Sequence, residues 1–180
     1  MPKCGRKKKL MLKIGCWNVR TLQDNGSNLE RRTAIIALEL SRYDLDIVAL
    51  SETRFAEEGQ MKELSGGYTF FWKGKDLSES RTNGVGFALK NHIAAKLESL
   101  PKGINDRLMV LRLPIGKTQY ATFVSAYAPT MTNPDDIKDE FYCDLESVLC
   151  SVPASDKLFL MGDFNARVGS DSSAWAGVIG

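Results

Sequence analysis

Hydrophobic residues along this chain form short runs separated by turn residues. Each run predicts a β-strand, because a strand buries a few consecutive or alternating side chains between two turns. The turn residues at 114–117 predict that the runs on either side pair as antiparallel strands. The predicted strands cover residues 10–17, 46–52, 68–72, 84–89, 107–113, 119–127 and 157–165.

Two further stretches place apolar residues at helical spacing. One runs from Leu29 to near Ser41, and Asn28 is positioned to cap its first turn. The other begins at Pro134, where two acidic residues face the positive end of the helix dipole, and it ends before Pro153. Residues 73–83 are expected to form a polar loop, and residues 169–180 predict no element.

The stretch Lys157–Asn165 carries the most informative pattern. Its apolar run predicts a buried strand that ends in Gly-Asp-Phe-Asn. Because side chains alternate across a strand, Asp163 and Asn165 are expected on the same face. In α/β folds, ligands commonly bind at strand ends of this kind. The same residues are also typical of a turn, since Gly, Asp and Asn are frequent turn residues.

Length and composition predict one soluble globular domain. A chain of 180 residues, 43% hydrophobic and 26% charged, is large enough to bury a core. The apolar stretch Leu10–Leu12 is interrupted at once by Lys13, and no apolar run is long enough to cross a bilayer. We therefore expect an intracellular protein, in the nucleus or the cytoplasm, without a membrane partner.

The basic residues are concentrated at the N-terminus. Residues 1–13 hold six basic side chains and no acid, so a total charge of +2 leaves −4 on the remainder (+2 less 6). We expect residues 1–10 to form a disordered basic tail. Such a tail could act as a nuclear-import signal, bind phosphates, or serve only solubility.

The inventory of cysteine and histidine argues against a zinc site. The four cysteines, Cys4, Cys16, Cys143 and Cys150, show no Cys-x-x-Cys spacing, and His92 is the single histidine. Reduced thiols are expected in an intracellular protein.

Four predicted strands end on polar functional groups. These groups are Asn18, Glu52, Tyr127 and the pair Asp163 and Asn165. A site made of carboxylates, carboxamides and a phenol favours a hard divalent cation such as Mg²⁺, which prefers oxygen ligands. Mg²⁺ held in this way is typical of phosphate-ester chemistry, where it neutralises charge on the phosphoryl oxygens.

Five motifs, in this order, resemble the endonuclease/exonuclease/phosphatase superfamily. They are Trp17-Asn18-Val19-Arg20, Leu50-Ser51-Glu52-Thr53, Gly84-Val85-Gly86, Ala126-Tyr127-Ala128-Pro129 and Gly162-Asp163-Phe164-Asn165. They are most similar to the apurinic-type endonuclease domains of non-LTR retrotransposons, a kind also found in craniofacial development protein 2. The resemblance covers roughly residues 11–175 and implies an α/β fold. In that fold two sheets form a sandwich flanked by helices, with the site at one edge.

The resemblance implies a role for each polar strand end. Glu52 would be the principal ligand of Mg²⁺ or Mn²⁺, with Asn18 close to the same ion. Asp163 would position or deprotonate the attacking water, or protonate the leaving oxygen, and it would lie near the metal. Asn165 would hydrogen-bond the phosphate or assist the metal. Tyr127 would contact the phosphate or stabilise the leaving group.

The resemblance also implies the substrate and the reaction. Arg107 matches a position near the substrate. The reaction would be in-line attack on a phosphodiester of DNA, catalysed by placement and charge neutralisation. The protein is expected to be a monomer, fused in longer forms to a reverse transcriptase or another domain.

The chain departs from the family pattern in two places. Arg20 stands where many relatives have an aspartate. The closing Ser-Asp-His motif is absent, because Asp171 has no histidine after it and His92 lies midway along the chain. We therefore expect residues 11–180 to form a C-terminally truncated domain with an unpaired edge or exposed apolar face. Its nuclease activity is expected to be weak or absent.

Three functions are compatible with these residues. The first is a Mg²⁺-dependent DNA endonuclease domain of retrotransposon origin. The second is a phosphatase or phosphodiesterase of the same superfamily, although the basic tail favours nucleic acid over lipid or inositol phosphates. The third is a non-catalytic module that binds nucleic acid or protein.

Overall fold

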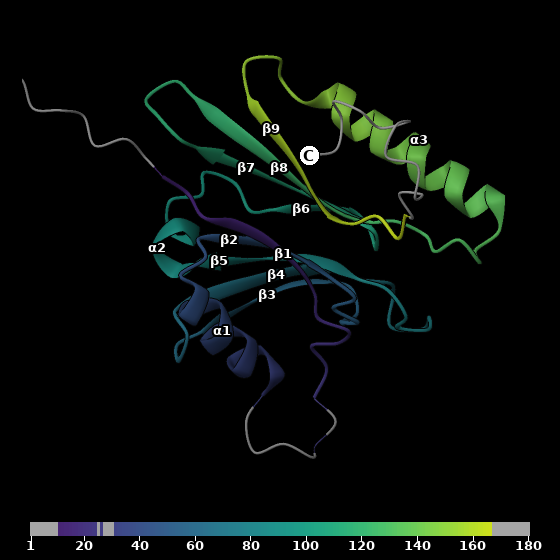
Figure 1. The fold of residues 1–180 in the computed structure, drawn as a ribbon, viewed down its shortest axis with the longest axis horizontal. Coiled ribbons are helices and arrows are strands. Elements are labelled where there is room, and N and C mark those ends of the chain that lie inside the picture. The colour runs from purple at the N-terminus through teal and green to yellow at the C-terminus, as the bar shows by residue number, and fades with distance from the viewer. Residues whose placement is uncertain (1–10, 25, 27–30, 167–180) are drawn as a thin grey trace, which may run out of the picture.

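The computed structural model describes residues 11–24, 26 and 31–166, which form two β-sheets packed face to face between two helices (Figure 1). The first sheet has the order β1-β2-β5-β4-β3, and the second has the order β6-β7-β8-β9. The strands of the first sheet are β1 Ile14–Asn18, β2 Ile47–Ser51, β3 Glu58–Glu63, β4 Tyr68–Lys73 and β5 Val85–Lys90. Those of the second are β6 Lys102–Asn105, β7 Leu108–Pro114, β8 Tyr120–Tyr127 and β9 Lys157–Asp163. The helices are α1 Arg32–Tyr43, α2 Asn91–Ala94 and α3 Asp135–Ser151.

Apolar side chains fill three layers between these elements. Phe87 of β5 and Phe123 of β8 are fully buried in the central layer, where the two sheets meet. Leu40 of α1 packs on the outer face of the first sheet, and Phe141 of α3 packs on the outer face of the second. This arrangement confirms the predicted α/β sandwich of two sheets flanked by helices.

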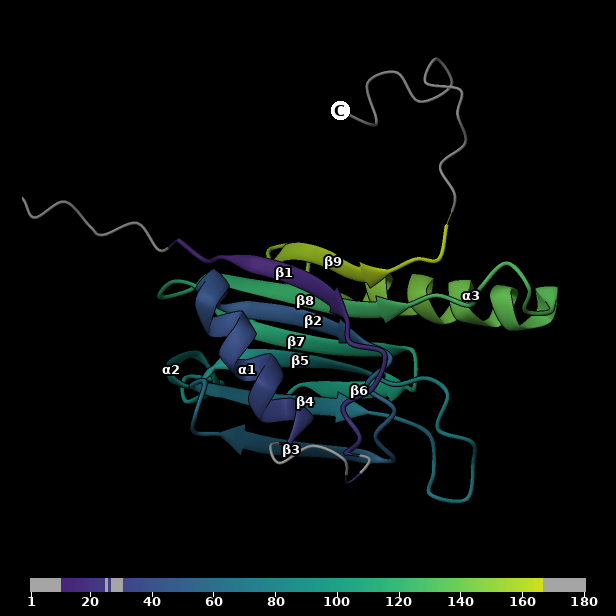
Figure 2. The same cartoon turned by 60° about the horizontal axis from the view of Figure 1, so that its bottom comes forward.

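Two parallel strand pairs bring four strand ends together. β1 runs parallel to β2 with Asn18 opposite Ser51, and β8 runs parallel to β9 with Tyr127 opposite Asp163. β1 and β9 contact each other across the sandwich and lie side by side along one edge (Figure 2). The carboxyl ends of all four strands therefore meet at one place, which is where open α/β sheets commonly bind ligands.

The predicted buried strand at 157–165 is an edge strand instead. Among the described residues β9 pairs with β8 alone, and Leu158 and Leu160 are 43% and 40% exposed. Its other face, with Phe159 and Met161, packs into the central core. As far as the structure describes the chain, β9 is therefore covered on one face, and the expected truncation of the domain stays a prediction.

Three short elements and one helix start differ from the predictions. β3, α2 and β6 were not predicted, because β3 is a mostly polar edge strand and the other two have four residues each. The first helix begins at Arg32, whose backbone N–H donates to Asp24 Oδ1 at 2.8 Å. Asn28 and residues 1–10 and 169–180 lie outside the described residues. No helix in the described part of the chain is long and apolar enough to span a membrane.

Candidate active site

The Asn18 side chain joins the two acids of the site. Its Nδ2 donates to Glu52 Oε1 at 2.8 Å and to Asp163 Oδ2 at 3.1 Å. A single amide nitrogen thus bridges the two carboxylates, although Glu52 and Asp163 are more than a hundred residues apart in the sequence. Asn18 Oδ1 accepts from the Arg20 backbone N–H at 3.0 Å, which orients the amide. Arg20, with a φ of 59°, holds the turn after β1.

Glu52 is held by three donors. Besides Asn18, the Tyr127 hydroxyl donates to Oε1 at 3.3 Å and Arg54 Nη2 donates to Oε2 at 2.9 Å. Burial by itself raises the pKa of Glu52, but these hydrogen bonds and the Arg54 charge outweigh it and hold the pKa below its usual value. The carboxyl group is therefore ionised at neutral pH, as a metal ligand must be.

The backbone after β2 aims Glu52 and Arg54 into the site. Both residues have a φ of 55°, in the left-handed region that long side chains seldom adopt. Thr53 between them is fully buried, and its N–H donates to Gly84 O at 3.1 Å. Gly84 permits this contact because its own φ is +114° and a Cβ there would meet Thr53 Oγ1 at 2.4 Å. Strained backbone held by its surroundings is typical of functional sites.

Tyr127 presents its hydroxyl to the site from a buried position at the end of β8. The residue is 7% exposed, and burial followed by the Glu52 charge raises the pKa of its phenol. Arg107 lies beside it, with Nη1 donating to Tyr127 O at 3.2 Å and the guanidinium carbon 5.4 Å from the ring centre. Tyr127 therefore keeps its proton at neutral pH and can act as a hydrogen-bond donor.

Asp163 and Asn165 lie close together, but not through strand alternation. β9 ends at Asp163, and Asn165 has a φ of 46°, outside the extended region. The backbone N–H of Asn165 donates to Asp163 Oδ1 at 3.0 Å, and its Nδ2 donates to Ala128 O at 2.7 Å. The expectation that both side chains share a strand face was therefore wrong. The turn interpretation describes the geometry of Asn165, while Asp163 ends a strand.

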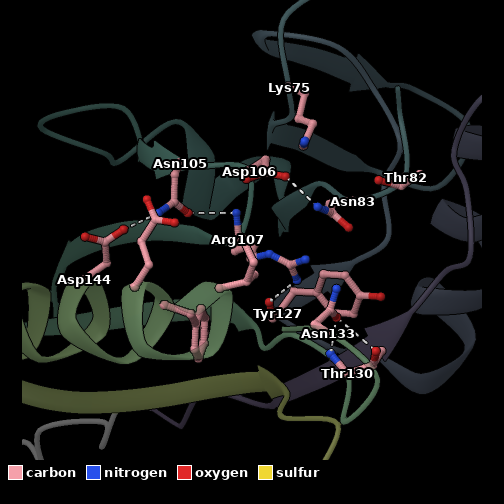
Figure 3. A pocket seen from close by; sticks show the side chains of 13 residues that line it. Lys75, Thr82, Asn83, Asn105, Asp106, Arg107, Tyr127, Thr130, Asn133 and Asp144 are labelled. Atoms are coloured by element: carbon pink, nitrogen blue, oxygen red, sulfur yellow. Dashed lines mark hydrogen bonds between the residues drawn. The ribbon is translucent and has the colours of Figure 1, made fainter. Parts of the chain in front are cut away.

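A pocket of about 600 Å³ opens beside Tyr127 (Figure 3). Two cations, Lys75 and Arg107, line it together with three acids, Asp106, Glu140 and Asp144. Neighbouring asparagine side chains donate to Asp106 and Asp144, and Lys75 pairs with Glu79 at 3.3 Å. A second pocket of about 520 Å³ is lined by residues of β1 and by the segment 162–166. The polar site thus lies between two hollows that could hold the two sides of an extended substrate.

The structure brings together most of the predicted site residues. Asn18, Glu52, Tyr127 and Asp163 form one hydrogen-bonded group, and Arg107 and Asn165 lie next to it. His92 belongs to α2, which follows β5 at the end of the sheet opposite Glu52 (Figure 1).

Two cations, one at the site and one in the adjoining pocket, were not predicted from the sequence. Arg54 could have been found, because it follows Glu52 by two residues. Lys75 offered no signal, because it lies in a polar loop far from every motif.

The donor set fits a hard divalent ion. Glu52 and Asp163 supply two carboxylates that share the Nδ2 of Asn18, and Mg²⁺ in proteins is commonly held by one or two carboxylates with several waters. Within the described residues no group of three or more acidic, histidine or cysteine side chains is assembled for a metal. Two carboxylates would leave coordination positions of a divalent ion open to water or substrate.

Comparisons with known proteins agree with this geometry. A model of the Endonuclease/Exonuclease/phosphatase family matches residues 15–179. Craniofacial development protein 2 from Bos taurus is 31% identical over 157 residues, which are 87% of this chain and 24% of that protein. The protein from Tragulus javanicus is also 31% identical over 157 residues, or 87% of this chain and 25% of that protein. The chain thus spans about a quarter of the length of these relatives.

Solved structures share the fold at lower identity. Humanized D. rerio TDP2 superimposes with a TM-score of 0.55 and 17% identity, over 94% of this chain and 71% of that chain. ANGEL2, a 2',3'-cyclic phosphatase, has a TM-score of 0.53 and 17% identity, over 91% and 55%. The family match, the relatives and the convergent strand ends agree, and the chain belongs to the Endonuclease/Exonuclease/phosphatase family.

Proposed function

We propose that this chain is a divalent-metal-dependent phosphodiesterase domain that acts on DNA. The observation that carries the proposal is the Asn18 amide, which holds the carboxylates of Glu52 and Asp163 together beside the Tyr127 hydroxyl. Two neighbouring carboxylates, one of which accepts from a phenol, lie between two hollows, and this arrangement suits a reaction at a charged phosphate ester. We also propose that the domain is of retrotransposon origin, as the resemblance of its motifs implies.

The proposed metal ligands are Glu52 and Asp163, with Asn18 and Asn165 close to the ion. Mg²⁺ or Mn²⁺ bound there would neutralise charge on the phosphate oxygens. The all-oxygen donor set supports these two ions over zinc.

The chain's own side chains supply the remaining steps. Tyr127, whose phenol stays protonated, would donate to a phosphate oxygen. Asp163 would orient the attacking water or protonate the leaving oxygen, and Asn165 would contact the phosphate. Arg107 and Lys75, which line the adjoining pocket, would hold neighbouring phosphates.

DNA as the substrate rests on charge and on analogy. The first thirteen residues carry six basic side chains. The pocket lining holds two cations but also three acids, so the charge argument rests on the basic N-terminal segment. The D. rerio TDP2 protein, which has a similar fold, is described in complex with a single-strand DNA product. This likeness supports a nucleic-acid substrate by analogy of fold alone.

We propose that the 180-residue chain hydrolyses DNA slowly or not at all. The only histidine of the sequence, His92, is at the opposite end of the sheet, so the site lacks the imidazole expected from the family resemblance. This observation also supports a second candidate, a module that binds metal and nucleic acid without cleavage.

Metal titration and plasmid nicking test the proposal. We expect the chain to bind Mn²⁺ and single-stranded DNA, and both Glu52→Gln and Asp163→Asn to weaken Mn²⁺ binding. Absence of Mn²⁺ binding would contradict the metal site. Robust nicking in Mg²⁺ that disappears in both variants would show that the proposal of weak activity is wrong.

A further inference from the structure

The arginine beside the proposed metal site has no assigned role. Arg54 Nη2 donates to Glu52 Oε2 at 2.9 Å, on the side of the carboxylate opposite Asn18. The pair is only partly covered, with 42% of the Arg54 side chain and 17% of the Glu52 side chain exposed. A positive charge therefore rests directly on the carboxylate that is proposed as the principal metal ligand.

The backbone of Arg54 is held by two hydrogen bonds that do not involve its own side chain. Arg54 N donates to Asn83 O at 2.9 Å, and Arg54 O accepts from Gln23 Nε2. The left-handed φ of 55° of this residue is unfavourable for a long side chain. A surface ion pair that served only stability would not require such a conformation, because such pairs contribute little.

The guanidinium uses only part of its hydrogen-bonding capacity. Arg54 Nε is buried and has no hydrogen-bond partner among the described residues. Nε and a terminal nitrogen form one edge of the guanidinium fork, which binds carboxylates and phosphates best when both nitrogens donate. Glu52 engages this edge through one nitrogen, and a turn of the side chain would bring the buried Nε to an oxyanion that accepts from both nitrogens.

We propose that Arg54 is an internal counter-cation: it pairs with Glu52 when no divalent ion is present and turns its fork to a phosphate oxygen of the substrate when the ion binds Glu52. The inference rests on the proposed metal site. Arg54 competes with the divalent ion for Glu52, and this competition weakens metal binding until substrate is present. Arg54 is therefore a positioning residue that couples metal and phosphate binding.

The test measures Mn²⁺ affinity of the full chain without substrate, by calorimetry, in four forms. Arg54→Gln removes the competing charge and should bind Mn²⁺ about tenfold more tightly than the unaltered chain. Arg54→Lys keeps the charge and should leave Mn²⁺ affinity within about twofold. Arg42→Gln is the matched control, because Arg42 forms an exposed ion pair with Glu39 on α1, and it should change nothing.

The second measurement is binding of a short single-stranded DNA in Mn²⁺, by fluorescence anisotropy. Arg54→Gln and Arg54→Lys should both weaken it at least threefold, because neither side chain offers the planar fork. Arg42→Gln should bind as the unaltered chain does.

The outcomes separate this inference from the proposed function. If the unaltered chain binds Mn²⁺ and Arg54→Gln binds it no more tightly, the counter-cation role is wrong and the metal site stands. If neither form binds Mn²⁺, the metal site and the inference both fail. If Arg54→Gln does not fold, unchanged DNA affinity in Arg54→Lys overturns the inference, and a loss supports it.

Discussion

Two clusters of charged side chains lie at opposite ends of β2. At its N-terminal end, Lys13 and Lys90 pair with Asp44 and Asp46, with Nζ to oxygen distances of 2.7 Å for Lys13–Asp44 and 3.0 Å for Lys90–Asp46. At its C-terminal end, Glu52 and the nearby Asp163 are held by an amide, a phenol and one arginine. We call these the distal cluster and the site cluster.

The distal cluster is balanced, whereas the site cluster is not. Two lysines neutralise two aspartates in the distal cluster, where Lys13 and Asp44 are exposed and Lys90 and Asp46 are largely covered. In the site cluster two carboxylates share neutral donors and one cation, which leaves negative charge and strained backbone. Unbalanced, partly buried charge is more informative about function than a count of ion pairs.

Backbone strain is also explained differently in the two clusters. Asp44 has a left-handed φ of 55° because it caps the C-terminus of α1, where its N–H donates to Leu40 and Ser41 carbonyls. Glu52 and Arg54 have the same φ without ending a helix. Their conformation serves to aim side chains, which supports a role in binding.

The largest expected effect comes from Gly162→Ala. Gly162 has a φ of +139°, and a Cβ there would lie 1.9 Å from Ala126 O, so the β8–β9 pairing must distort. We expect the free energy of unfolding in urea to fall by about 3 kcal/mol or more. Gly67→Ala is the control, because its φ of +76° adds strain but nothing lies within 4 Å of the new Cβ. Equal losses in the two variants would contradict the steric argument.

Glu52→Gln tests whether the site cluster binds metal and the distal cluster does not. Removal of the principal carboxylate should lower Mn²⁺ affinity by on the order of 100-fold. Asp44→Asn removes a carboxylate from the distal cluster and should leave Mn²⁺ affinity unchanged, because lysines already neutralise that cluster. Calorimetric titration measures the Mn²⁺ affinity of both variants. A loss of affinity in Asp44→Asn would show that the two clusters do not differ in metal binding.

Asn18→Ala tests the bridge within the site cluster. Without the amide, Glu52 and Asp163 lose a shared donor and repel each other directly. We expect the free energy of unfolding to fall by about 1 kcal/mol and the pKa of Glu52 to rise. Urea unfolding and carboxyl ¹³C NMR titration provide the measurements. A pKa unchanged from that of the unaltered chain would mean that the bridge has no electrostatic role.

The smallest expected effect is a difference in salt sensitivity. The hydrogen bonds and charges of Lys13 and Lys90 lower the pKa of Asp44 from 3.8 to about 2. Because the folded pKa is lowered, this stabilisation is present above pH 3.8 and is lost as the pH falls toward 2. High salt should raise the pKa of exposed Asp44 more than that of Glu52, whose donors include neutral groups. Carboxyl NMR titrations at two salt concentrations would test this, and equal shifts would refute it.

Much of the sandwich could be predicted, but its edge strands could not. β2 and β8 are buried along almost their whole length, so their apolar runs are unambiguous. β3 is mostly polar and lies at the edge of a sheet. The apolar run of β9 predicts a buried strand, although one face of β9 is exposed. Local hydrophobicity does not record how many neighbours a strand has, since pairing is decided by distant segments.

The residues of the candidate site could be predicted from the sequence, but the arrangement of their side chains could not. The motifs identified Asn18, Glu52, Tyr127 and Asp163, because each polar residue ends an apolar run. Neither the bridging role of Asn18 nor the pairing of Arg54 with Glu52 could be predicted, since both depend on side-chain directions set by the turns after β1 and β2.

The sequence by itself determined the strands that carry the candidate site and the functional group at the end of each strand. Alternation and apolar runs involve residues that are neighbours in the chain, so they can be recognised in the sequence alone. The tertiary structure alone decided that two parallel strand pairs end at one place and that Asn165 turns away from its strand. It also decided that one cluster of charges is balanced while the other is not. These features depend on residues far apart in the chain, where burial and hydrogen bonding are settled by packing.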